Sequence, residues 1–518
     1  MWDAVIIGSG FGGAMVAHRL IAAGARVLML ERGDWVPRGD AAWLPGASLE
    51  LTPAYAKDIP YRCETGGHGK QIGGYACVGG PSVYYGCVAL RFRERDFAGD
   101  PGVVGDSGAA WPYRYDELEP YYGRAERLLR IAGDDTGDPT APRRTAPYPF
   151  VPAPLARVSE HVVDSAVALG LSPFRLPLAI DHARCVACRT CDTYACAIEA
   201  KNDVATTMIR PLIARGLRLV TGAIATRIEV EAGAARRVQV LHKATGEREA
   251  IAARHVIVAA GALGSAHLVL ASRLDELSPA RAAVGRYLMR HDNAMIFGFY
   301  GERPDREHRF HKQIAIHDWY FGAPPGEDRA GAAGRDAGDE DGDGLTKLGG
   351  VQQMMTPPVE LVRAHLPRPL RMLAAFSEHL TGLLCIAEDQ PQRGNGCAVD
   401  WAVRDAYGLP QLVIDHAYSP RDRAASNALV RRARRVLDHT GAVVSYTHRV
   451  KTFSHAVGTL RMGTDPETSP LDEVCRFRNV ANLWVTDGSA LPMSAGVNPS
   501  LTIAANALRA ADAIVEAA

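Results

Sequence analysis

A glycine-rich loop between two short apolar runs, at the start of the chain, constrains the fold more than any other feature. Asp3–Ile7 suits a buried parallel strand, the loop Gly8–Gly13 follows at once, and Ala14–Ala23 has a helical pattern. A second apolar strand, Val27–Leu30, ends at Glu31. This is the order of elements in a dinucleotide-binding βαβ unit. The sequence predicts such a unit in preference to a fortuitous glycine turn.

The glycines and the terminal acid each have a physical role in such a unit. Gly8 permits the tight turn, Gly10 lets the backbone approach a pyrophosphate, and Gly13 lets helix and strand pack closely. The pyrophosphate would lie at the positive end of the helix dipole. Glu31, 18 residues after Gly13, is suited to accept hydrogen bonds from a ribose diol. Its charge would repel a 2′-phosphate, which argues against NADP, but the segment leaves FAD and NAD open.

Composition excludes several other classes of protein. The 518 residues include 58 basic and 58 acidic side chains, so we expect neither nucleic acid nor an anionic membrane as the main partner. No apolar run reaches the roughly 18 residues of a membrane span, and Pro358–Cys385, interrupted by arginines, favours a helix pair over an amphipathic lid. A strand pattern begins almost at Met1, so we expect no signal peptide and a cytoplasmic location.

The middle of the chain contains a second strand–glycine–helix junction. The sequence predicts strands at 217–230 and 235–252 with a turn at Gly246, then an apolar strand at 255–260, glycines at 261–265 and a helix from Ala266. We interpret this junction as another βα unit of the first sheet. Gly322–Gly344, rich in Gly, Ala, Asp and Glu, is typical of a disordered insertion.

The carboxy-terminal region contains residues suited to chemistry. His455 begins a His-Ala-Val-Gly-Thr block, and Asn482–Ser489 is typical of a strand that ends in a turn. Asn498 occupies the expected N-cap of a long final helix, with Pro499 at its first position. Without further context, His455 could equally be a core histidine and Asn498 a helix cap.

Together these blocks resemble the glucose–methanol–choline (GMC) oxidoreductases, a family of FAD-dependent alcohol-oxidising enzymes. The resemblance covers essentially the whole chain and includes the first glycine loop, Val78–Gly86, Trp111–Tyr122, Ala259–Ser265, Val284–Arg286 with His291, and His455 to the end. It implies an α/β fold: a Rossmann-like FAD-binding domain and a second, substrate domain built on an antiparallel sheet. We expect residues 1–90, 205–290 and 450–518 in the first domain, and 91–204 and 291–449 in the second.

The resemblance also implies a reaction. His455 would take the hydroxyl proton of an alcohol, Asn498 would hold the substrate oxygen, and hydride would pass to flavin N5. The expected substrate is a small molecule with an alcohol group: a sugar, a polyol or a sterol-like alcohol. Two alternatives are a non-redox flavin-containing lyase of the hydroxynitrile type and a flavin-binding scaffold without activity.

We expect the FAD to be bound without a covalent link, because Val83 and Tyr84 stand where covalent members of the family have a histidine. Tyr85 stands where members often have asparagine. The residues expected at the cofactor are Gly8, Gly10, Gly12, Gly13, Glu31, Arg32, Gly79, Gly80, Ser82, Tyr85, Ala225, Ala260, Gly261, Asp487, Gly488, Asn498, Pro499 and Ser500.

Four of the ten cysteines are clustered, at Cys185, Cys188, Cys191 and Cys196. Their spacing resembles an iron–sulfur loop, although the last gap is x4 and no proline follows. A zinc site with four cysteine ligands and thiols or disulfides without a metal are the alternatives. We expect an iron–sulfur cluster, which would relay electrons to an acceptor protein or a quinone. Such a relay favours a dehydrogenase over an oxidase.

Overall fold

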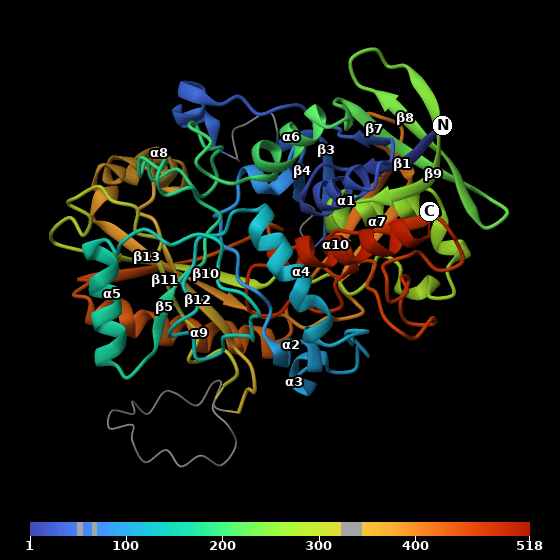
Figure 1. Ribbon diagram of the computed structural model, residues 1–518. Helices are drawn as coiled ribbons and strands as arrows, with labels where there is room; N and C mark the ends of the chain where they lie inside the picture. Colours follow the sequence, from blue (N-terminus) through green and yellow to red (C-terminus); the bar gives the residue numbers. More distant parts are fainter. Residues whose placement is uncertain (49–54, 65–69, 323–343, 518) are drawn as a thin grey trace.

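Three β-sheets organise the protein, whose computed structural model describes residues 1–48, 55–64, 70–322 and 344–517. The first sheet and its helices lie on one side of the molecule, and the second sheet lies on the other (Figure 1). The expected insertion at 322–344 lies almost entirely outside the described residues. The mixed α/β class predicted from the sequence is confirmed.

The largest sheet contains the amino-terminal βαβ unit. Its order is β6-β2-β1-β9-β8-β7, with β17 paired to β9. Strands β6, β2, β1, β9 and β17 are parallel, whereas β7, β8 and β9 form an antiparallel ribbon. The bounds are β1 Trp2–Ile7, β2 Val27–Leu30, β6 Arg218–Val220, β7 Ala223–Glu231, β8 Ala234–His242, β9 Arg248–Val258 and β17 Leu483–Val485.

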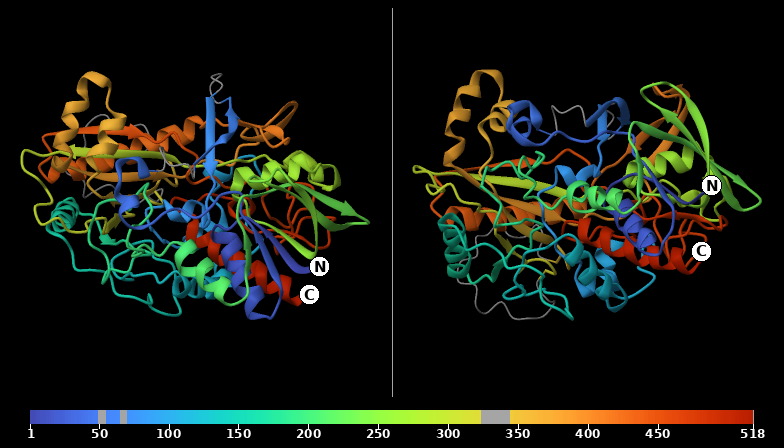
Figure 2. Two further views of the ribbon diagram at one scale, coloured as in Figure 1. Left: turned by 90° about the horizontal axis from the view of Figure 1, so that it is seen from above. Right: turned by 45° about the horizontal axis from the view of Figure 1, so that its top comes forward.

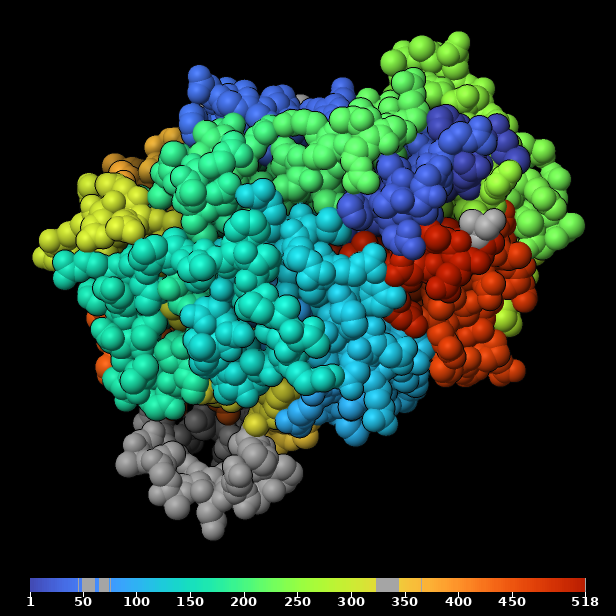
Figure 3. Space-filling model, in the orientation of Figure 1, coloured from blue at the N-terminus to red at the C-terminus, as the bar shows by residue number. Residues whose placement is uncertain are grey.

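Helices cover this sheet and bring the two ends of the chain together. Helix α1 (Phe11–Ala22) follows β1 and packs against the final helix, α10 (Ser500–Glu516), which also contacts α4 (Tyr115–Leu128). Figure 2 shows α1 and α10 side by side, and in Figure 3 the first and last segments adjoin on one face. Val5 and Ile6 in β1 are completely buried, because the central strands of a parallel sheet are covered on both faces.

The second sheet is antiparallel throughout, in the order β16-β10-β13-β12-β11-β5. Helix α9 (Pro420–His439) packs across it, and α5 (Arg157–Ala168) packs against α9 and the β5 edge. The strand bounds are β5 Pro173–Arg175, β10 Asp292–Phe299, β11 Ile314–Ile316, β12 Gly349–Met354, β13 Leu380–Ala387 and β16 Val444–Arg449.

A third sheet, in the order β14-β15-β3-β4, joins an early segment to a late one. Strand β3 pairs in parallel with β15, more than 300 residues further along the chain. The bounds are β3 Tyr55–Cys63, β4 Lys70–Tyr75, β14 Gly396–Arg404 and β15 Pro410–Asp415. The remaining helices are η1 Gly39–Trp43, η2 Pro45–Ala47, η4 Gly80–Val83, α2 Glu94–Ala98, α3 Pro101–Val104, η5 Ala205–Ile209, α6 Arg210–Ala214, α7 Gly261–Ala271, η6 Leu274–Leu277, η7 Arg281–Ala283, α8 Val359–His365, η8 Arg368–His379 and η9 Gly488–Ala490.

The structure corrects several element boundaries. The strand expected at 217–230 is two strands, β6 and β7, and the strand expected at 235–252 is β8 and the first part of β9, which turn back at Gly246. The strand expected at 255–260 is the last part of the same β9. Helix α7 begins at Gly261 rather than Ala266, since its glycine turn is already helical. The stretch Pro358–Cys385 contains two short helices, α8 and η8, but its end belongs to β13. No helix in the described part of the chain is long and apolar enough to cross a bilayer.

Candidate active site

The Gly8–Gly13 loop meets a second glycine loop, Val78–Gly86, at the end of β1, and Ser9 links the two. The Ser9 hydroxyl donates to Glu31 Oε2 at 2.6 Å and accepts from the backbone N–H of Gly79 at 2.9 Å. Gly79 has a φ of +90°, a conformation that favours glycine. The first loop, the end of β2 and the second loop are therefore held together by one hydroxyl and one carboxylate.

Glu31 lies where the sequence placed the ribose-binding acid, and the protein already uses both of its oxygens. Oε2 accepts from the Ser9 backbone and hydroxyl, and Oε1 accepts from the N–H of Gly33 at 2.9 Å. Burial raises the pKa of Glu31, and these hydrogen bonds oppose the rise. A carboxylate offers about four acceptor sites, so a ribose hydroxyl can still bind.

The first loop leaves room where a pyrophosphate would have to lie. Among the described residues, a Cβ added at Gly10 would meet only the Pro81 side chain, at 4.0 Å, and no side chain caps the start of α1. A Cβ at Gly12 or Gly13 would instead lie 2.3 Å from Thr486 O or 2.1 Å from Gly8 O. The residues present therefore fit a dinucleotide, since the backbone N–H groups at this helix start remain available to an anion.

At the second glycine junction, Gly261–Ser265, the Asp487 side chain hydrogen-bonds to other groups of the protein. Its carboxylate accepts from Gly261 N at 2.8 Å, from the Ser265 hydroxyl at 2.5 Å and from Ser489. Burial raises the pKa of Asp487, and these bonds oppose the rise. The side chain thus ties α7 to the turn after β17, and Gly488 begins η9 within that turn.

The other residues expected at the cofactor are spread around these loops. The Ser82 hydroxyl donates to Gly79 O within the second loop. The Ser500 hydroxyl donates to Val88 O at 3.3 Å, which links α10 to the segment just after that loop. Arg32 donates to the Tyr61 hydroxyl. Ala260 precedes α7, Gly80 begins η4, Pro499 precedes α10, and Ala225 lies in β7, the outermost strand of the ribbon.

His455 and Asn498 meet, although 43 positions separate them in the chain. Asn498 Nδ2 lies 3.3 Å from His455 Nε2, and Asn498 Oδ1 accepts from Gln352 Nε2 at 2.6 Å. Both His455 and Asn498 are only half-buried. Asn498 makes no capping bond to α10, whose N-cap is Pro499, because its amide is engaged by His455 and Gln352 instead. The helix-cap interpretation is therefore wrong.

The other imidazole nitrogen of His455 faces a second histidine. His455 Nδ1 lies 2.9 Å from His291 Nδ1, and Asn293 Nδ2 lies 3.5 Å from the same atom. Burial lowers the pKa of His455 to about 3, with further lowering from His291 and Lys312. Burial also lowers the pKa of His291. Both rings are therefore neutral at pH 7, and His455 is able to accept a proton.

Sequence reasoning placed His291 only in a motif and did not identify Gln352 or Asn293. Gln352 comes from β12 and Asn293 from β10. Neither residue has a local signature, because only the pairing of the antiparallel sheet brings these strands beside the carboxy-terminal block. Strand β12, Gly-Gly-Val-Gln-Gln-Met, has no alternation of apolar and polar residues that would have placed Gln352 on a face.

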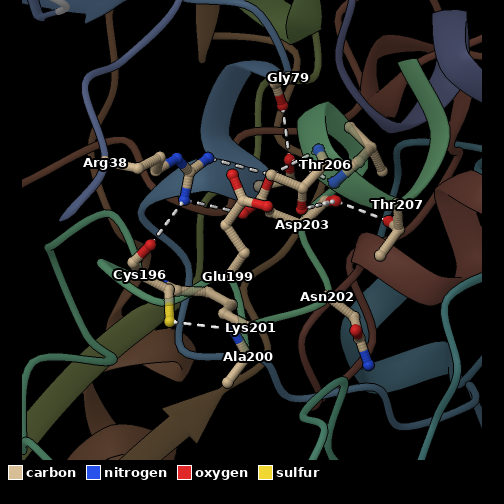
Figure 4. Close-up of polar contacts among 12 residues, drawn as sticks. Arg38, Gly79, Cys196, Glu199, Ala200, Lys201, Asn202, Asp203, Thr206 and Thr207 are labelled. Atoms are coloured by element: carbon tan, nitrogen blue, oxygen red, sulfur yellow. Dashed lines mark hydrogen bonds and ion pairs between the residues drawn. The ribbon is translucent and has the colours of Figure 1, made fainter. Parts of the chain in front are cut away.

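The segment after the cysteine loop is held firmly against the second glycine loop. The buried Lys201 ammonium donates to the carbonyls of Tyr85, Cys191 and Tyr194, at 2.6 to 3.0 Å. The Tyr85 hydroxyl donates to Asn202 O at 3.0 Å. Figure 4 shows the other end of this contact, where Arg38 bridges Asp203 and the Cys196 carbonyl.

The four clustered cysteines do not form the predicted metal site. In the described ranges, no group of three or more His, Cys, Asp or Glu side chains is arranged to hold a metal ion. Cys185 lies near the other three cysteines, whose charges add to the burial that raises the pKa of its thiol. Three of the sulfurs also have contacts of their own: Cys196 accepts from Ala200 N at 3.3 Å, Cys188 lies 3.1 Å from Thr190 Oγ1, and Cys191 contacts Cys87. This structure therefore does not support an iron–sulfur cluster or a zinc ion at this loop.

Comparison with known proteins defines the class. Residues 111–293 and 394–507 match the two family models described as GMC oxidoreductase. The chain is 30% identical to 6'''-hydroxyparomomycin C oxidase of Streptomyces lividus, over 99% of this chain and 91% of that protein. It is 27% identical to 2-methyl-1,2-propanediol dehydrogenase of Mycolicibacterium austroafricanum, over 99% and 95%.

Solved structures agree on the fold. Pyridoxine 4-oxidase from Mesorbium loti aligns with a TM-score of 0.65 at 20% identity, covering 99% of each chain. An FAD-dependent oxidoreductase from Chaetomium thermophilum aligns with a TM-score of 0.64 at 16% identity, covering 100% and 99%. The chain belongs to the GMC oxidoreductase family, and its cofactor is the family's FAD.

Proposed function

We propose that this protein oxidises a CH–OH group of a small alcohol to the carbonyl, with His455 as the proton acceptor and Asn498 as the anchor of the substrate oxygen. The observation that supports this most directly is the 3.3 Å approach of Asn498 Nδ2 to His455 Nε2. A substrate hydroxyl that lies beside both nitrogens can accept a hydrogen bond from the amide and donate its proton to the ring. This arrangement matches general base catalysis.

The residues divide the work as follows. FAD, when bound, supplies the acceptor for the hydride. His455 takes the hydroxyl proton while the carbon loses its hydride, so that the C–O bond becomes a carbonyl and two electrons leave with the hydride. Asn498 holds the oxygen, and Gln352 fixes the amide of Asn498 so that its N–H groups face the reaction. Because its pKa is lowered, His455 is unprotonated across the neutral pH range, although the same lowering makes it a weaker base.

The cofactor would bind without a covalent link, between the Gly8–Gly13 loop and the start of α10. Support comes from the open space at Gly10 and from the absence of a histidine in Val78–Gly86. In this proposal, residues 1–90, 205–290 and 450–518 form the FAD-binding domain, and 91–204 and 291–449 form the substrate domain.

The substrate would be a sugar, a polyol or a sterol-like alcohol. The relatives named above act on a hydroxylated paromomycin and on 2-methyl-1,2-propanediol, which favours polar alcohols with several hydroxyl groups. The electrons would then pass to oxygen, to a quinone or to an acceptor protein. A cytoplasmic location fits the ten cysteines, all within the described residues and none in a disulfide, since reducing compartments disfavour disulfide bonds.

Anaerobic titration of the purified holoprotein with a panel of alcohols tests the reaction. Bleaching of the flavin absorbance by any alcohol supports an oxidoreductase, whereas cleavage of a hydroxynitrile without bleaching would establish the lyase alternative. Oxygen uptake measured with the same alcohol separates an oxidase from a dehydrogenase.

His455→Ala tests the assigned base. We expect flavin reduction to slow by about 10² to 10⁴-fold while FAD content is retained. His439→Ala, the same substitution at an exposed position near the end of α9, is the matched control and should reduce its flavin at the wild-type rate. Unchanged reduction in His455→Ala would contradict the mechanism.

A further inference from the structure

His291 is a buried histidine whose ring points at the proposed base. It lies immediately before β10, is 1% exposed, and has a φ of +61°. Positive φ is uncommon for a residue with a side chain, and such residues concentrate at functional sites. Its Nδ1 lies 2.9 Å from His455 Nδ1, and its Nε2 lies 3.1 Å from the carbonyl oxygen of Ser494.

The hydrogen bonds around the two rings determine which nitrogens hold protons. Ser494 O can only accept, so His291 Nε2 carries a hydrogen. A neutral His291 then has a bare Nδ1, which must accept from His455 Nδ1–H. A neutral His455 therefore has its lone pair on Nε2, the atom that faces the N–H groups of Asn498 at 3.3 Å. Each of these hydrogen bonds has one donor and one acceptor. The contact of Asn293 Nδ2 with His455 Nδ1, at 3.5 Å, is too long to determine which nitrogen carries the proton.

A single carboxylate, that of Asp389, holds both the His291 backbone and Ser494, whose carbonyl binds the His291 ring. Asp389 Oδ1 accepts from the His291 backbone N–H at 3.0 Å and from the Ser494 hydroxyl at 3.0 Å, and Oδ2 accepts from Arg290 N at 2.8 Å. Asp389 thus fixes the strained backbone that carries the ring and the residue whose carbonyl holds Nε2. It is itself buried, at 1% exposure.

We propose that His291 is a positioning residue that keeps the proton of His455 on Nδ1, so that Nε2 is the nitrogen that accepts the substrate proton. This inference rests on the proposed function. In the reaction, the O–H bond breaks and its proton forms an N–H bond at Nε2. His455 then carries hydrogens on both nitrogens and the positive charge, while His291 stays neutral and continues to accept from Nδ1.

The charged groups around the pair are consistent with a neutral partner. Lys312 and Asp389 face His455, and Asp389 and Lys347 face His291. Since His291 contributes no negative charge, it orients His455 with a smaller effect on the pKa of His455 than a carboxylate would have. A carboxylate in the same place would orient the ring equally but would raise the pKa of His455, and this difference can be measured.

Three substitutions at His291 test the inference in the holoenzyme. His291→Asn keeps an acceptor near the position of Nδ1 and tolerates the positive φ, whereas His291→Phe keeps the ring shape without nitrogens. We expect His291→Phe to reduce flavin at least about 10-fold more slowly, within the range for loss of the base itself, and His291→Asn to recover most of that rate. FAD content and thermal unfolding, measured on both, identify a variant that fails to fold.

His291→Asp supplies the pH readout. The base works only when unprotonated, so a raised pKa moves the acidic limb of the rate profile to higher pH. We expect wild-type flavin reduction to stay constant over the range in which His291→Asp loses rate on acidification.

Equal rates for folded His291→Asn and His291→Phe would overturn the inference, and so would an unshifted acidic limb in folded His291→Asp. If His291→Phe is purified without FAD, His291→Ala takes its place in the comparison, because it also removes both ring nitrogens but introduces a smaller side chain. Failure of the proposed function is distinguishable, because no alcohol would then bleach the wild-type flavin.

Discussion

Substituting Gly10 should separate cofactor binding from folding. Gly10 has φ −70° and ψ −166°, which any residue can adopt, and an added Cβ would meet only Pro81 among the described residues, at 4.0 Å. The alanine variant therefore keeps the backbone and its packing, and we expect its free energy of unfolding without FAD to change by less than about 0.5 kcal/mol. The methyl group would instead occupy space between the two glycine loops that the pyrophosphate needs.

Gly12→Ala is the contrasting variant. Its Cβ would lie 2.3 Å from Thr486 O and 2.9 Å from Thr486 C, about 1 Å inside an ordinary contact. The start of α1 would have to move away from the turn after β17. Overpacking of this kind typically costs about 1 to 3 kcal/mol, with or without the cofactor.

The assay removes FAD from each protein, follows urea unfolding, and then titrates FAD back by the quenching of its fluorescence. We expect Gly10→Ala to match wild type in unfolding and to bind FAD at least about 10-fold more weakly, a loss of about 1.4 kcal/mol. We expect Gly12→Ala to be destabilised before any FAD is added. Wild-type FAD affinity in Gly10→Ala, or wild-type stability in Gly12→Ala, would refute this assignment of the loop.

Three further predictions concern the rest of the chain. Glu126→Leu removes a carboxylate that binds the buried Arg91 guanidinium at 2.8 Å. We expect the free energy of unfolding, measured in urea, to fall by about 3 to 5 kcal/mol, and a fall below about 1 kcal/mol would contradict this prediction. Burial alone would raise the pKa of Asp305, but hydrogen bonds from His311 and the Arg309 backbone lower it to about 2. The stabilisation from Asp305 is therefore present above its ordinary pKa of about 4 and is lost as the pH falls towards about 2. The free energy of unfolding of Asp305→Asn should depend less on pH in that window than that of the wild type. The loop Cys185–Cys196 should yield four titratable thiols and less than one iron per chain, and stoichiometric iron with acid-labile sulfide would restore the cluster prediction.

The sequence by itself determined the elements whose contacts are local. Strand β2 occupies the predicted Val27–Leu30, and α10 begins at Ser500, one residue after the predicted Pro499. Apolar spacing, glycine turns and a proline near the helix start act within a few residues, which is why the sequence places such elements closely. The βαβ unit is of the same kind, since β1, α1 and β2 lie within about 30 residues and need only their own loop to meet.

The tertiary structure alone decided which distant residues meet. His291 and His455 are 164 positions apart, and Gln352 reaches Asn498 only because β12 lies beside the carboxy-terminal block. The same packing engaged the Asn498 amide, so that a residue typical of a helix cap does not cap α10. The spacing of the cysteines along the chain resembles that of a cluster-binding loop, but a metal needs several sulfurs placed around one point. Whether they are so placed depends on the whole fold around them, and the described residues contain no such group.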